Sequence, residues 1–391
     1  MKIGFDAKRA AQNRTGLGNY SRFIIRILSE NFPGNSYHLY TPKPYRIPYL
    51  KEIPTLSRLH LHFPPKGLAS RLRSLWRVWG VKADICRDGL DIFHGLSNEL
   101  PLNIGTPEKR RAEEGEGRCR YVVTIHDLIF LHTPQYYHWI DRQIYNFKFR
   151  HACRCADRVI AVSEYTKREI MDYYRVPEEK IDVVYQGCDP VFAREIPAEK
   201  LAEVRAKYRL PDQFVLYVGS IEERKNLMLV AEALLHAQGK QGGENLQVVA
   251  VGRRTPYVDR VQAYLDDNGL ASRFHFHHQV PYEDLPAFYK LATVFVYPSR
   301  IEGFGIPLLE AITSGVPAIG CTGSCLEEAG GPDSLYVDPD RAEEMAEAIL
   351  RVATDQDLRQ NMIARGKEYA RNFTDTKLCN DLMAVYERLK V

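Results

Sequence analysis

The chain has 391 residues, of which 45% are hydrophobic and 26% charged, and its formal net charge is +3. This length exceeds one ordinary domain and fits two domains of roughly 150–200 residues each, with the composition of a soluble globular protein. No run approaches 18 uninterrupted apolar residues, which excludes a typical transmembrane helix.

The positive charge is concentrated in the first half of the chain. Residues 1–190 contain 30 Lys and Arg against 21 Asp and Glu, whereas the remaining residues contain 23 against 29. This excess favours an anionic partner, either phosphate or an acidic membrane surface. Nucleic acid is disfavoured, because neither a recognition-helix motif nor an aromatic-basic platform accompanies the charge. The eight cysteines form no Cys-x-x-Cys pair and predict reduced, buried thiols.

Short β-rich runs alternate with amphipathic stretches along the whole chain, which is typical of parallel sheets covered by helices. The first ten residues, MKIGFDAKRA, predict a buried strand rather than a secretory signal, so we expect a cytoplasmic protein. The strands predicted in the first half are 2–7, 37–41, 91–95, 121–126, 158–163 and 182–186, and those in the second half are 214–219, 246–252, 274–277, 294–298 and 317–321. Two such series predict an α/β protein with two tandem Rossmann-like, doubly wound domains facing each other across a cleft.

Glycine and proline interrupt the pattern at residues 187–193 (GCDPVFA), where we place the domain boundary. The predicted domains are residues 1–190 and residues 191–372. A C-terminal helix at 373–391 could pack back on the first domain. The charged segment 103–120 predicts a loop, either a surface excursion or a flexible edge of an acceptor site.

Two motifs in the first half lie where doubly wound sheets bind ligands, just after a predicted strand. In residues 15–20 (TGLGNY), Gly16 and Gly18 would let the backbone approach an anion at a helix N-terminus, although a tight turn explains the motif as well. His126 closes the strand 121–126 and can bind a sugar hydroxyl or transfer a proton. Taken alone, a structural histidine is the commoner case.

In the second half, residues 219–226 (GSIEERKN) follow a predicted strand and open a helix. Arg224 and Lys225 oppose the macrodipole of that helix, which is unfavourable unless an anion such as a diphosphate binds there. Charge-assisted contacts to such an anion contribute roughly 1.5–3 kcal/mol each. A solvated helix start is the alternative interpretation.

The most specific motif is residues 298–310 (PSRIEGFGIPLLE). Glu302 lies in a glycine-bearing loop, and Glu310 follows it by eight positions in the next predicted helix. The glycines and the proline suit a loop whose amides face phosphate or sugar. The paired carboxylates of a glycosidase flank one bond, whereas these two can hold opposite ends of one ligand.

Together these segments resemble the E-x7-E signature of the large family of retaining GT-B glycosyltransferases, the glycosyl transferases of group 1, which includes bacterial α-mannosyltransferases. The resemblance spans nearly the whole chain, through TGLGNY, the strand ending in HD, AVSEYTKREI, VYQGCDP, YVGSIEERKN and the 302–310 block followed by SGVPAIG. TGLGNY and ERKN are most similar to the mannosyltransferase-like branch.

The resemblance implies that residues 1–190 bind the acceptor and that residues 191–372 bind the nucleotide-sugar donor, and it implies a role for each motif of the chain. Gly16 and Gly18 would lie against the donor phosphates or the acceptor, and His126 would contact the transferred sugar near the reaction centre. Arg224 and Lys225 would neutralise the diphosphate as it leaves.

The resemblance also implies donor contacts in the second half of the chain. Glu302 would hold the hydroxyls of the sugar, and Glu310 would hold those of the ribose. The other implied contacts are the amides of Gly303, Phe304, Gly305 and Ile306, the loop around Val280 that recognises the base, and Ser220. Many relatives have an arginine in place of Ser220, so Lys225 would carry more of the phosphate charge here.

The implied activity is retaining transfer of a hexose, with GDP-mannose as the favoured donor, to a glycan or lipid-linked acceptor in surface polysaccharide synthesis. No Asp-x-Asp metal motif is evident near the predicted cleft, so we expect no metal and no cofactor besides the nucleotide diphosphate sugar as co-substrate. A UDP-sugar donor, a nucleotide-sugar epimerase and a silent nucleotide-sugar-binding subunit remain as alternatives.

Residues 66–82 (KGLASRLRSLWRVWGVK) predict an amphipathic helix with basic residues beside its apolar face. That face comprises Leu68, Leu72, Leu75, Trp76 and Trp79. The helix either packs on the first sheet or forms a peripheral contact with the anionic inner face of the membrane, near a lipid-linked acceptor.

Overall fold

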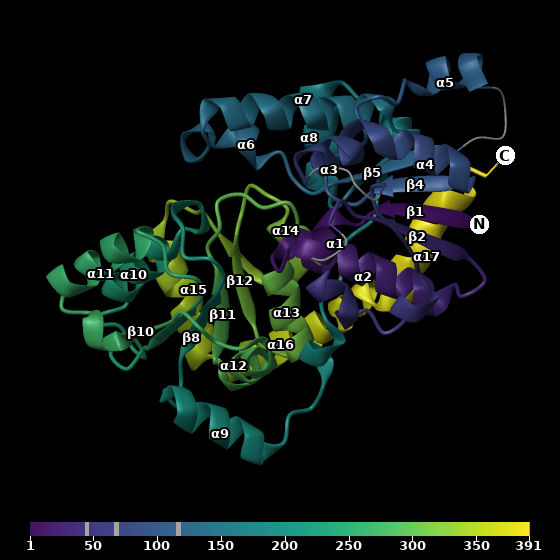
Figure 1. Ribbon diagram of the computed structural model, residues 1–391. Coiled ribbons are helices and arrows are strands. Elements are labelled where there is room, and N and C mark those ends of the chain that lie inside the picture. Colours follow the sequence, from purple (N-terminus) through teal and green to yellow (C-terminus); the bar gives the residue numbers. More distant parts are fainter. Residues whose placement is uncertain (44–46, 66–69, 115–118, 391) are drawn as a thin grey trace. The chain divides into compact units, whose positions relative to one another are not determined.

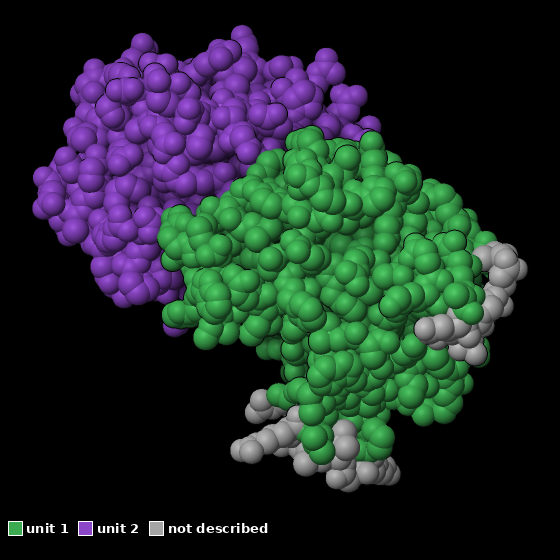
Figure 2. Space-filling model, turned by 90° about the horizontal axis from the view of Figure 1, so that it is seen from above, with its two compact units in different colours: residues 1–186, 375–391 green, residues 187–374 purple. Residues whose placement is uncertain are grey.

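The structure is a computed structural model that describes residues 1–43, 47–65, 70–114 and 119–390. The chain divides into two compact units, residues 1–186 with 375–391, and residues 187–374 (Figure 2). Each unit contains a single sheet in which every neighbouring pair of strands is parallel, within the described residues.

The first unit is built on a seven-stranded sheet with the order β3-β2-β1-β4-β5-β6-β7 (Figure 1). Its strands are β1 (Lys2–Asp6), β2 (Ser36–Tyr40), β3 (His60–His62), β4 (Ile92–Gly95), β5 (Arg120–Ile125), β6 (Arg158–Ala161) and β7 (Ile181–Val183). Its helices are α1 (Lys8–Gln12), α2 (Gly16–Asn31), α3 (Ser70–Leu75), the π-helical turn η3 (Trp76–Gly80), α4 (Val81–Asp88), α5 (Pro107–Glu114), α6 (Ile129–His132), α7 (Trp139–Cys155), α8 (Glu164–Tyr174) and α17 (Asp375–Glu387). Short 3-10 turns occur at η1 (Pro48–Glu52), η2 (Leu56–Arg58), η4 (Pro134–Tyr136) and η5 (Glu178–Lys180).

The sheet of the first unit is buried on both faces, which explains why its strands are continuous apolar runs rather than alternating ones. One core forms between the sheet and the helices α1, α2 and α17, and the other involves α4, α7 and α8. The chain returns to this unit after the second one because α17 buries Leu378, Leu382 and Tyr386 in the first core. Its apolar face therefore completes a core that begins more than 350 residues earlier.

The second unit has a six-stranded sheet with the order β10-β9-β8-β11-β12-β13 (Figure 1). Its strands are β8 (Val215–Val218), β9 (Val248–Val251), β10 (Phe274–His277), β11 (Val294–Tyr297), β12 (Ala318–Cys321) and β13 (Leu335–Val337). Its helices are α9 (Ala198–Tyr208), α10 (Leu227–His236), α11 (Tyr257–Asp267), α12 (Leu285–Leu291), α13 (Ile306–Ser314), α14 (Leu326–Gly330), α15 (Ala342–Thr354) and α16 (Gln356–Ala370). Its 3-10 turns are η6 (Pro190–Ala193), η7 (Glu223–Lys225), η8 (Ala271–Arg273), η9 (Tyr282–Asp284) and η10 (Arg371–Phe373).

The predicted fold class, two doubly wound α/β domains, is confirmed, and two short strands are additional to the prediction. β3 and β13 have three residues each and lie at the edges of their sheets, so they lack the long apolar run on which strand prediction depends. No helix among the described residues is long and apolar enough to cross a membrane.

The predicted loop at 103–120 is partly wrong, because residues 107–114 form the helix α5, while 115–118 lie outside the described residues. This helix has no apolar periodicity that would have revealed it. Instead, one buried arginine anchors it: Arg110 donates to the carbonyl of Gly105 at 2.5 Å, to that of Cys155 at 2.7 Å, and to Asp157 at 2.5 Å.

The return of α17 can be tested at a buried polar contact. The hydroxyl of Tyr386 lies 2.6 Å from Nδ1 of His94, whose Nε2 lies 2.8 Å from Oγ1 of Thr124. Burial lowers the pKa of His94 to about 3, so the ring is neutral at pH 7 and depends on these partners. We expect Tyr386→Phe to destabilise the first unit by about 1–3 kcal/mol, measured by calorimetry, because it leaves a buried ring nitrogen without its partner.

The matched control is Tyr173→Phe, since Tyr173 is 44% exposed on α8. An unfolding midpoint of Tyr386→Phe equal to that of the control would contradict the contact.

Candidate active site

The order of strands reverses between β8 and β11, which are neighbours in the second sheet. In open parallel sheets such a reversal opens a crevice beyond the carboxyl ends of the two strands, where ligands bind. The loop after β8 carries Arg224 and Lys225, and the loop after β11 carries Glu302. The topology thus brings the two most chemically informative motifs of the sequence to one place.

A single carboxylate oxygen, Oε1 of Glu302, is shared by four side chains. Nζ of Lys225 lies 2.5 Å from it, and Nη1 of Arg224 lies 3.0 Å from it. The hydroxyls of Ser299 and Tyr297 donate to the same oxygen over 2.6 Å and 3.1 Å. Lys225 also bonds to the hydroxyl of Tyr297, so this cluster is continuous across the two loops.

The electrostatics of this cluster favour an ionised Glu302. Burial alone would raise the pKa of its carboxyl, but Lys225 and Arg224 outweigh the burial and hold the pKa at about 2. A second carboxylate, that of Glu222, lies 3.0 Å from Nη2 of Arg224 and is 37% exposed, so two acidic side chains face the two cations. An incoming anion can replace the exposed Glu222 at Arg224 while the contacts of both cations to Glu302 remain.

The loop that follows Glu302 is held by its backbone. Gly305 has φ = 111°, a conformation that favours glycine, and a Cβ there would lie 2.8 Å from Leu326. The thiol of Cys325 lies 3.1 Å from the carbonyl oxygens of both Glu302 and Phe304. The side chain of Phe304 is buried against Phe373, so only its backbone is suited to a ligand contact.

Glu310 lies in α13, whose first residue is Ile306, and its Oε2 accepts a hydrogen bond of 2.8 Å from Tyr289. Burial raises the pKa of Glu310 to about 8, against the opposing effect of the Tyr289 hydrogen bond and with a further rise from Asp189. The two carboxyls of the motif thus differ in charge state at neutral pH. Glu302 is a carboxylate, whereas Glu310 is largely protonated.

The remaining predicted donor contacts of the second unit lie beyond the carboxyl ends of three strands, β8, β11 and β10. The carbonyl of Ser220 accepts from Tyr217 at 3.0 Å, just after β8. Gly303 lies between Glu302 and Phe304 in the loop after β11, and Val280 lies between β10 and η9. β10 forms the edge of the sheet two strands from β8, so Val280 belongs to a more distant part of the same sheet edge.

In the first unit, the structure brings His126 and the TGLGNY motif together. Tyr20, on the first turns of α2, packs edge-on against the ring of His126 with 4.5 Å between ring centroids. Nε2 of His126 donates to the carbonyl of Leu96 at 2.9 Å, and Nδ1 accepts from Gln186 at 3.0 Å. Burial lowers the pKa of His126 to about 4, so it is a neutral ring with both nitrogens engaged.

The two glycines of TGLGNY differ in their surroundings. A Cβ on Gly18 would lie 1.9 Å from the carbonyl oxygen of Asn13, so this glycine is required for the close approach of the preceding loop to α2. A Cβ on Gly16 would meet nothing within 4 Å. Gly18 thus has a structural reason within the fold, and Gly16 is the position open to a ligand.

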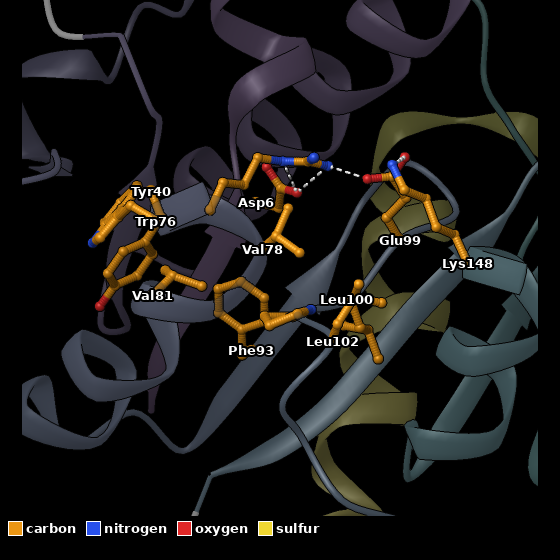
Figure 3. Close-up of a pocket in the computed structure, with 12 residues that line it drawn as sticks. Asp6, Tyr40, Trp76, Val78, Val81, Phe93, Glu99, Leu100, Leu102 and Lys148 are labelled. Atoms are coloured by element: carbon orange, nitrogen blue, oxygen red, sulfur yellow. Dashed lines mark hydrogen bonds and ion pairs between the residues drawn. The ribbon is translucent and has the colours of Figure 1, made fainter. Parts of the chain in front are cut away.

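A charged pocket at the first unit's own strand reversal, between β1 and β4, was missed by sequence reasoning (Figure 3). Arg77 donates to Asp6 and to Glu99 at 2.8 Å each, and Lys148 lies 3.2 Å from Glu99. Burial would raise the pKa of Glu99, but Arg77 and Lys148 lower it to about 2. Asp6 ends β1, and Glu99 lies in the loop that follows β4. Their positions at the carboxyl ends of strands are the one feature of the sequence that could have identified them.

This arrangement of two doubly wound sheets occurs in known glycosyltransferases. The structure is similar to the sucrose-phosphate synthase of Thermosynechococcus elongatus, with a TM-score of 0.74, 21% identity, and coverage of 100% of this chain and 99% of that one. The predicted GT-B fold is therefore confirmed.

The family follows from the sequence matches. Residues 202–369 match the model of the glycosyl transferases group 1, and residues 16–192 match that of the Glycosyltransferase Family 4. The group 1 match lies within the second unit, whereas the Family 4 match covers most of the first unit and ends at residue 192, inside the second. Together the two matches span most of the chain, which belongs to the group 1 glycosyltransferases of GT-B fold. The predicted class of enzyme, a hexosyltransferase, is confirmed.

Two curated relatives are mannosyltransferases. The chain is 28% identical to the O-antigen chain mannosyltransferase B of Escherichia coli over the full length of both proteins. It is 30% identical to the GDP-mannose-dependent alpha-(1-6)-phosphatidylinositol monomannoside mannosyltransferase of Mycobacterium tuberculosis, over 54% of this chain and 57% of that protein.

The two glycines of α2 give a matched pair of variants. We expect Gly18→Ala to destabilise the first unit by about 1–3 kcal/mol, because its Cβ overlaps a backbone oxygen that cannot move freely. Gly16→Ala should leave stability unchanged or raise it by roughly 0.4–1 kcal/mol, because only unfolded-state entropy changes. Calorimetric unfolding midpoints of both variants test this. Equal midpoints would contradict the close approach at Gly18.

Proposed function

We propose that the chain transfers a hexose, with retention of configuration, from a nucleoside diphosphate sugar to a glycan or lipid-linked acceptor in surface polysaccharide synthesis. GDP-mannose is the favoured donor. The observation that carries the proposal is the pair Arg224 and Lys225 around one buried carboxylate at the strand reversal of the second unit. The mannosyltransferase names of the full-length and partial relatives support the sugar and the base.

In the proposed mechanism, Arg224 and Lys225 stabilise the negative charge that develops on the departing diphosphate. The bond from the anomeric carbon to the diphosphate oxygen breaks, and a bond from an acceptor hydroxyl oxygen forms on the same face. The proton of that hydroxyl moves to the released diphosphate oxygen. Because the cations are already fixed by Glu302, little reorganisation is needed when the charge appears.

The two carboxyls of the motif have different proposed roles, and their charge states fit these roles. Glu302 is ionised and would accept hydrogen bonds from sugar hydroxyls while it orients Lys225. Glu310 would hold the ribose hydroxyls, and its raised pKa of about 8 lets it donate as well as accept at neutral pH. The amides of Gly303, Phe304, Gly305 and Ile306 would contact the sugar and the phosphates, with Ser220 beside them and Val280 toward the base.

In the first unit, His126 and Gly16 are the proposed contacts to the transferred sugar and the phosphates. Both ring nitrogens of His126 have internal partners, so a sugar hydroxyl would have to replace the carbonyl of Leu96 or the amide of Gln186. His126 is therefore better suited to positioning than to proton transfer. Gly18 would act through the shape of the turn.

The proposed location is cytoplasmic, with peripheral contact to an anionic membrane through the first unit. A lipid-linked acceptor would be anchored at that membrane, and the charge of residues 1–190 favours an acidic surface.

The proposed donor is tested by a thermal-shift screen of GDP, UDP, ADP and their sugar conjugates. A ligand at 100 times its Kd adds about 2.7 kcal/mol to stability, which shifts the midpoint by several degrees. We expect stabilisation by the guanosine series, and its loss in Lys225→Ala together with a fall in turnover of at least a hundredfold. Arg365→Ala is the control, because it removes an exposed cation on α16.

Near-normal turnover in Lys225→Ala would rule out the proposed site. Stabilisation by the uridine series alone would move the donor to a UDP-sugar and leave the site intact.

The proposed phosphate chemistry uses side chains in place of a metal. Since Lys225 and Arg224 supply two positive charges at 2.5 Å and 3.0 Å from Glu302, we expect turnover in excess EDTA to equal that in Mg²⁺ within a factor of about two. Strict dependence of initial rates on added Mg²⁺ or Mn²⁺ would contradict it.

A further inference from the structure

Two helices of the first unit expose large apolar side chains at helical spacing. On α7 the stripe follows Ile140, Ile144 and Phe147, with Trp139 beside it, and on α3 and η3 it follows Leu72, Leu75 and Trp79. Their exposed fractions are 68% for Trp139, 65% for Ile140, 62% for Phe147, 49% for Trp79, 46% for Leu75, 45% for Leu72 and 44% for Ile144. We call these seven residues the apolar surface.

The apolar surface has no counterpart within its own unit, as far as the structure describes it. The buried residues of α7 begin only at Phe149, so none of the first ten residues of this helix is fully buried, although Tyr145 packs against Phe130 and Lys148 lines the charged pocket. On the other helix, the π-helical turn directs Trp76 inward, where its indole donates to Asp84 at 2.7 Å, and leaves Trp79 outside. The predicted apolar face is therefore split between two environments. Trp76 is buried in the core of the first unit, whereas Trp79 is exposed. Leu68 lies outside the described residues.

The helices that carry the two stripes are linked through one segment of the chain. The segment 101–103 joins them: Leu102 donates to the carbonyl of Val78 at 2.8 Å, and Asn103 donates to that of Trp79 at 2.8 Å. His151 of α7 lies 3.1 Å from the carbonyl of Pro101. Phe147 stacks on His151, with 6.4 Å between their rings. The charged pocket of Arg77, Glu99 and Lys148 spans the same two helices (Figure 3).

The charges around the apolar surface favour a lipid bilayer over a second copy of the chain. Residues 66–83 contain five basic and no acidic residues, of which Arg77 is held by Asp6 and Glu99 in the charged pocket. In addition, α7 carries exposed Arg150 and Arg154 after the apolar stripe. In a symmetric dimer the same patch meets itself, which would bring two basic regions together. Anionic headgroups complement them instead, and tryptophans such as Trp79 and Trp139 favour the membrane interface.

We propose that the apolar surface, formed by α7 together with α3 and η3, inserts into the interface of an anionic bilayer. Docking there would bring the first unit, which is the proposed acceptor-binding unit, to the headgroup level, where a lipid-linked acceptor presents its sugar. The inference rests on the proposed function only for the acceptor, since docking itself requires no donor.

The chain contains its own probes for this docking, because its three tryptophans are Trp76, Trp79 and Trp139. We expect vesicles of phosphatidylcholine and phosphatidylglycerol with brominated acyl chains to quench the tryptophan fluorescence of the full chain. Quenching should be partial in Trp79→Phe and in Trp139→Phe, and absent in the double variant, whose remaining Trp76 is buried. Vesicles of phosphatidylcholine alone should quench at least tenfold less.

A second experiment uses sedimentation with the same anionic vesicles. The variant Ile140→Ser, Ile144→Ser, Phe147→Ser should lose at least tenfold in binding, whereas Tyr173→Ser, which removes an exposed aromatic elsewhere in the unit, should bind as the unchanged chain does. All four positions are exposed, and equal unfolding midpoints check the folding. Thermal shift by nucleotides should persist in the triple variant, so failure of docking is distinguishable from failure of the proposed donor site.

Absence of quenching and of sedimentation with anionic vesicles would overturn the inference. Equal binding by the triple variant would also overturn it. A concentration-dependent dimer in analytical ultracentrifugation that the triple variant lacks would assign the surface to a second copy instead.

Discussion

The proposed site depends on the ion pairs that the carboxylate of Glu302 forms with Lys225 and Arg224. This carboxylate fixes Lys225 and Arg224 from one loop to Tyr297 and Ser299 from another, and so joins the ends of β8 and β11. An isolated buried carboxylate would be strongly disfavoured, because burial penalises its charge. The two cations reverse that penalty, and in return the carboxylate keeps two positive charges close together at a point where they would otherwise repel each other.

An ion pair at the exposed edge of this cluster explains how one pair of loops can serve both structure and chemistry. Glu302 and Glu222 balance the charges of Arg224 and Lys225, so an incoming diphosphate has to replace one acidic partner when it binds. Here Arg224 also contacts Glu222, which is partly exposed and can exchange its partner more easily than Glu302. The guanidinium group of Arg224 therefore makes two kinds of contact: the one to Glu302 holds the site together, and the one to Glu222 can be replaced by a ligand.

Environment also distinguishes the two glutamates of the E-x7-E motif, which the sequence presents as equivalent. Glu302 lies among cations and has a pKa near 2, whereas Glu310 lies among Tyr289, Asp189 and apolar groups and has a pKa near 8. Spacing alone predicted that they could hold opposite ends of a ligand. It could not predict that one would be charged and the other protonated, because Asp189 lies 121 positions before Glu310 in the chain.

The sequence predicted most of the strands and the residues that follow them, since buried parallel strands are continuous apolar runs and ligand-binding residues come directly after such runs. It did not predict α5, which depends on the buried Arg110, or the pocket of Arg77 and Glu99. It also left the partners of His126 unknown, because Leu96 and Gln186 approach from 30 residues before and 60 residues after it. Each of these features depends on a polar contact between segments that are distant in the sequence. Such a contact produces no local periodicity of apolar residues from which it could be predicted.

For the exposed helices of the first unit, apolar periodicity predicts a helix but does not show what its apolar face contacts. A regular helix over 66–82 would place Trp76 and Trp79 on one face, and that face could be satisfied either by the sheet or by a membrane. The π-helical turn at Trp76–Gly80 resolves the choice by adding a residue to the turn, which sends Trp76 to Asp84 and leaves Trp79 outside. A helix with this local geometry can anchor to the core and present apolar side chains outward at the same time. The same turn carries Arg77 into the charged pocket, so the anchor, the exposed surface and the pocket share five consecutive residues.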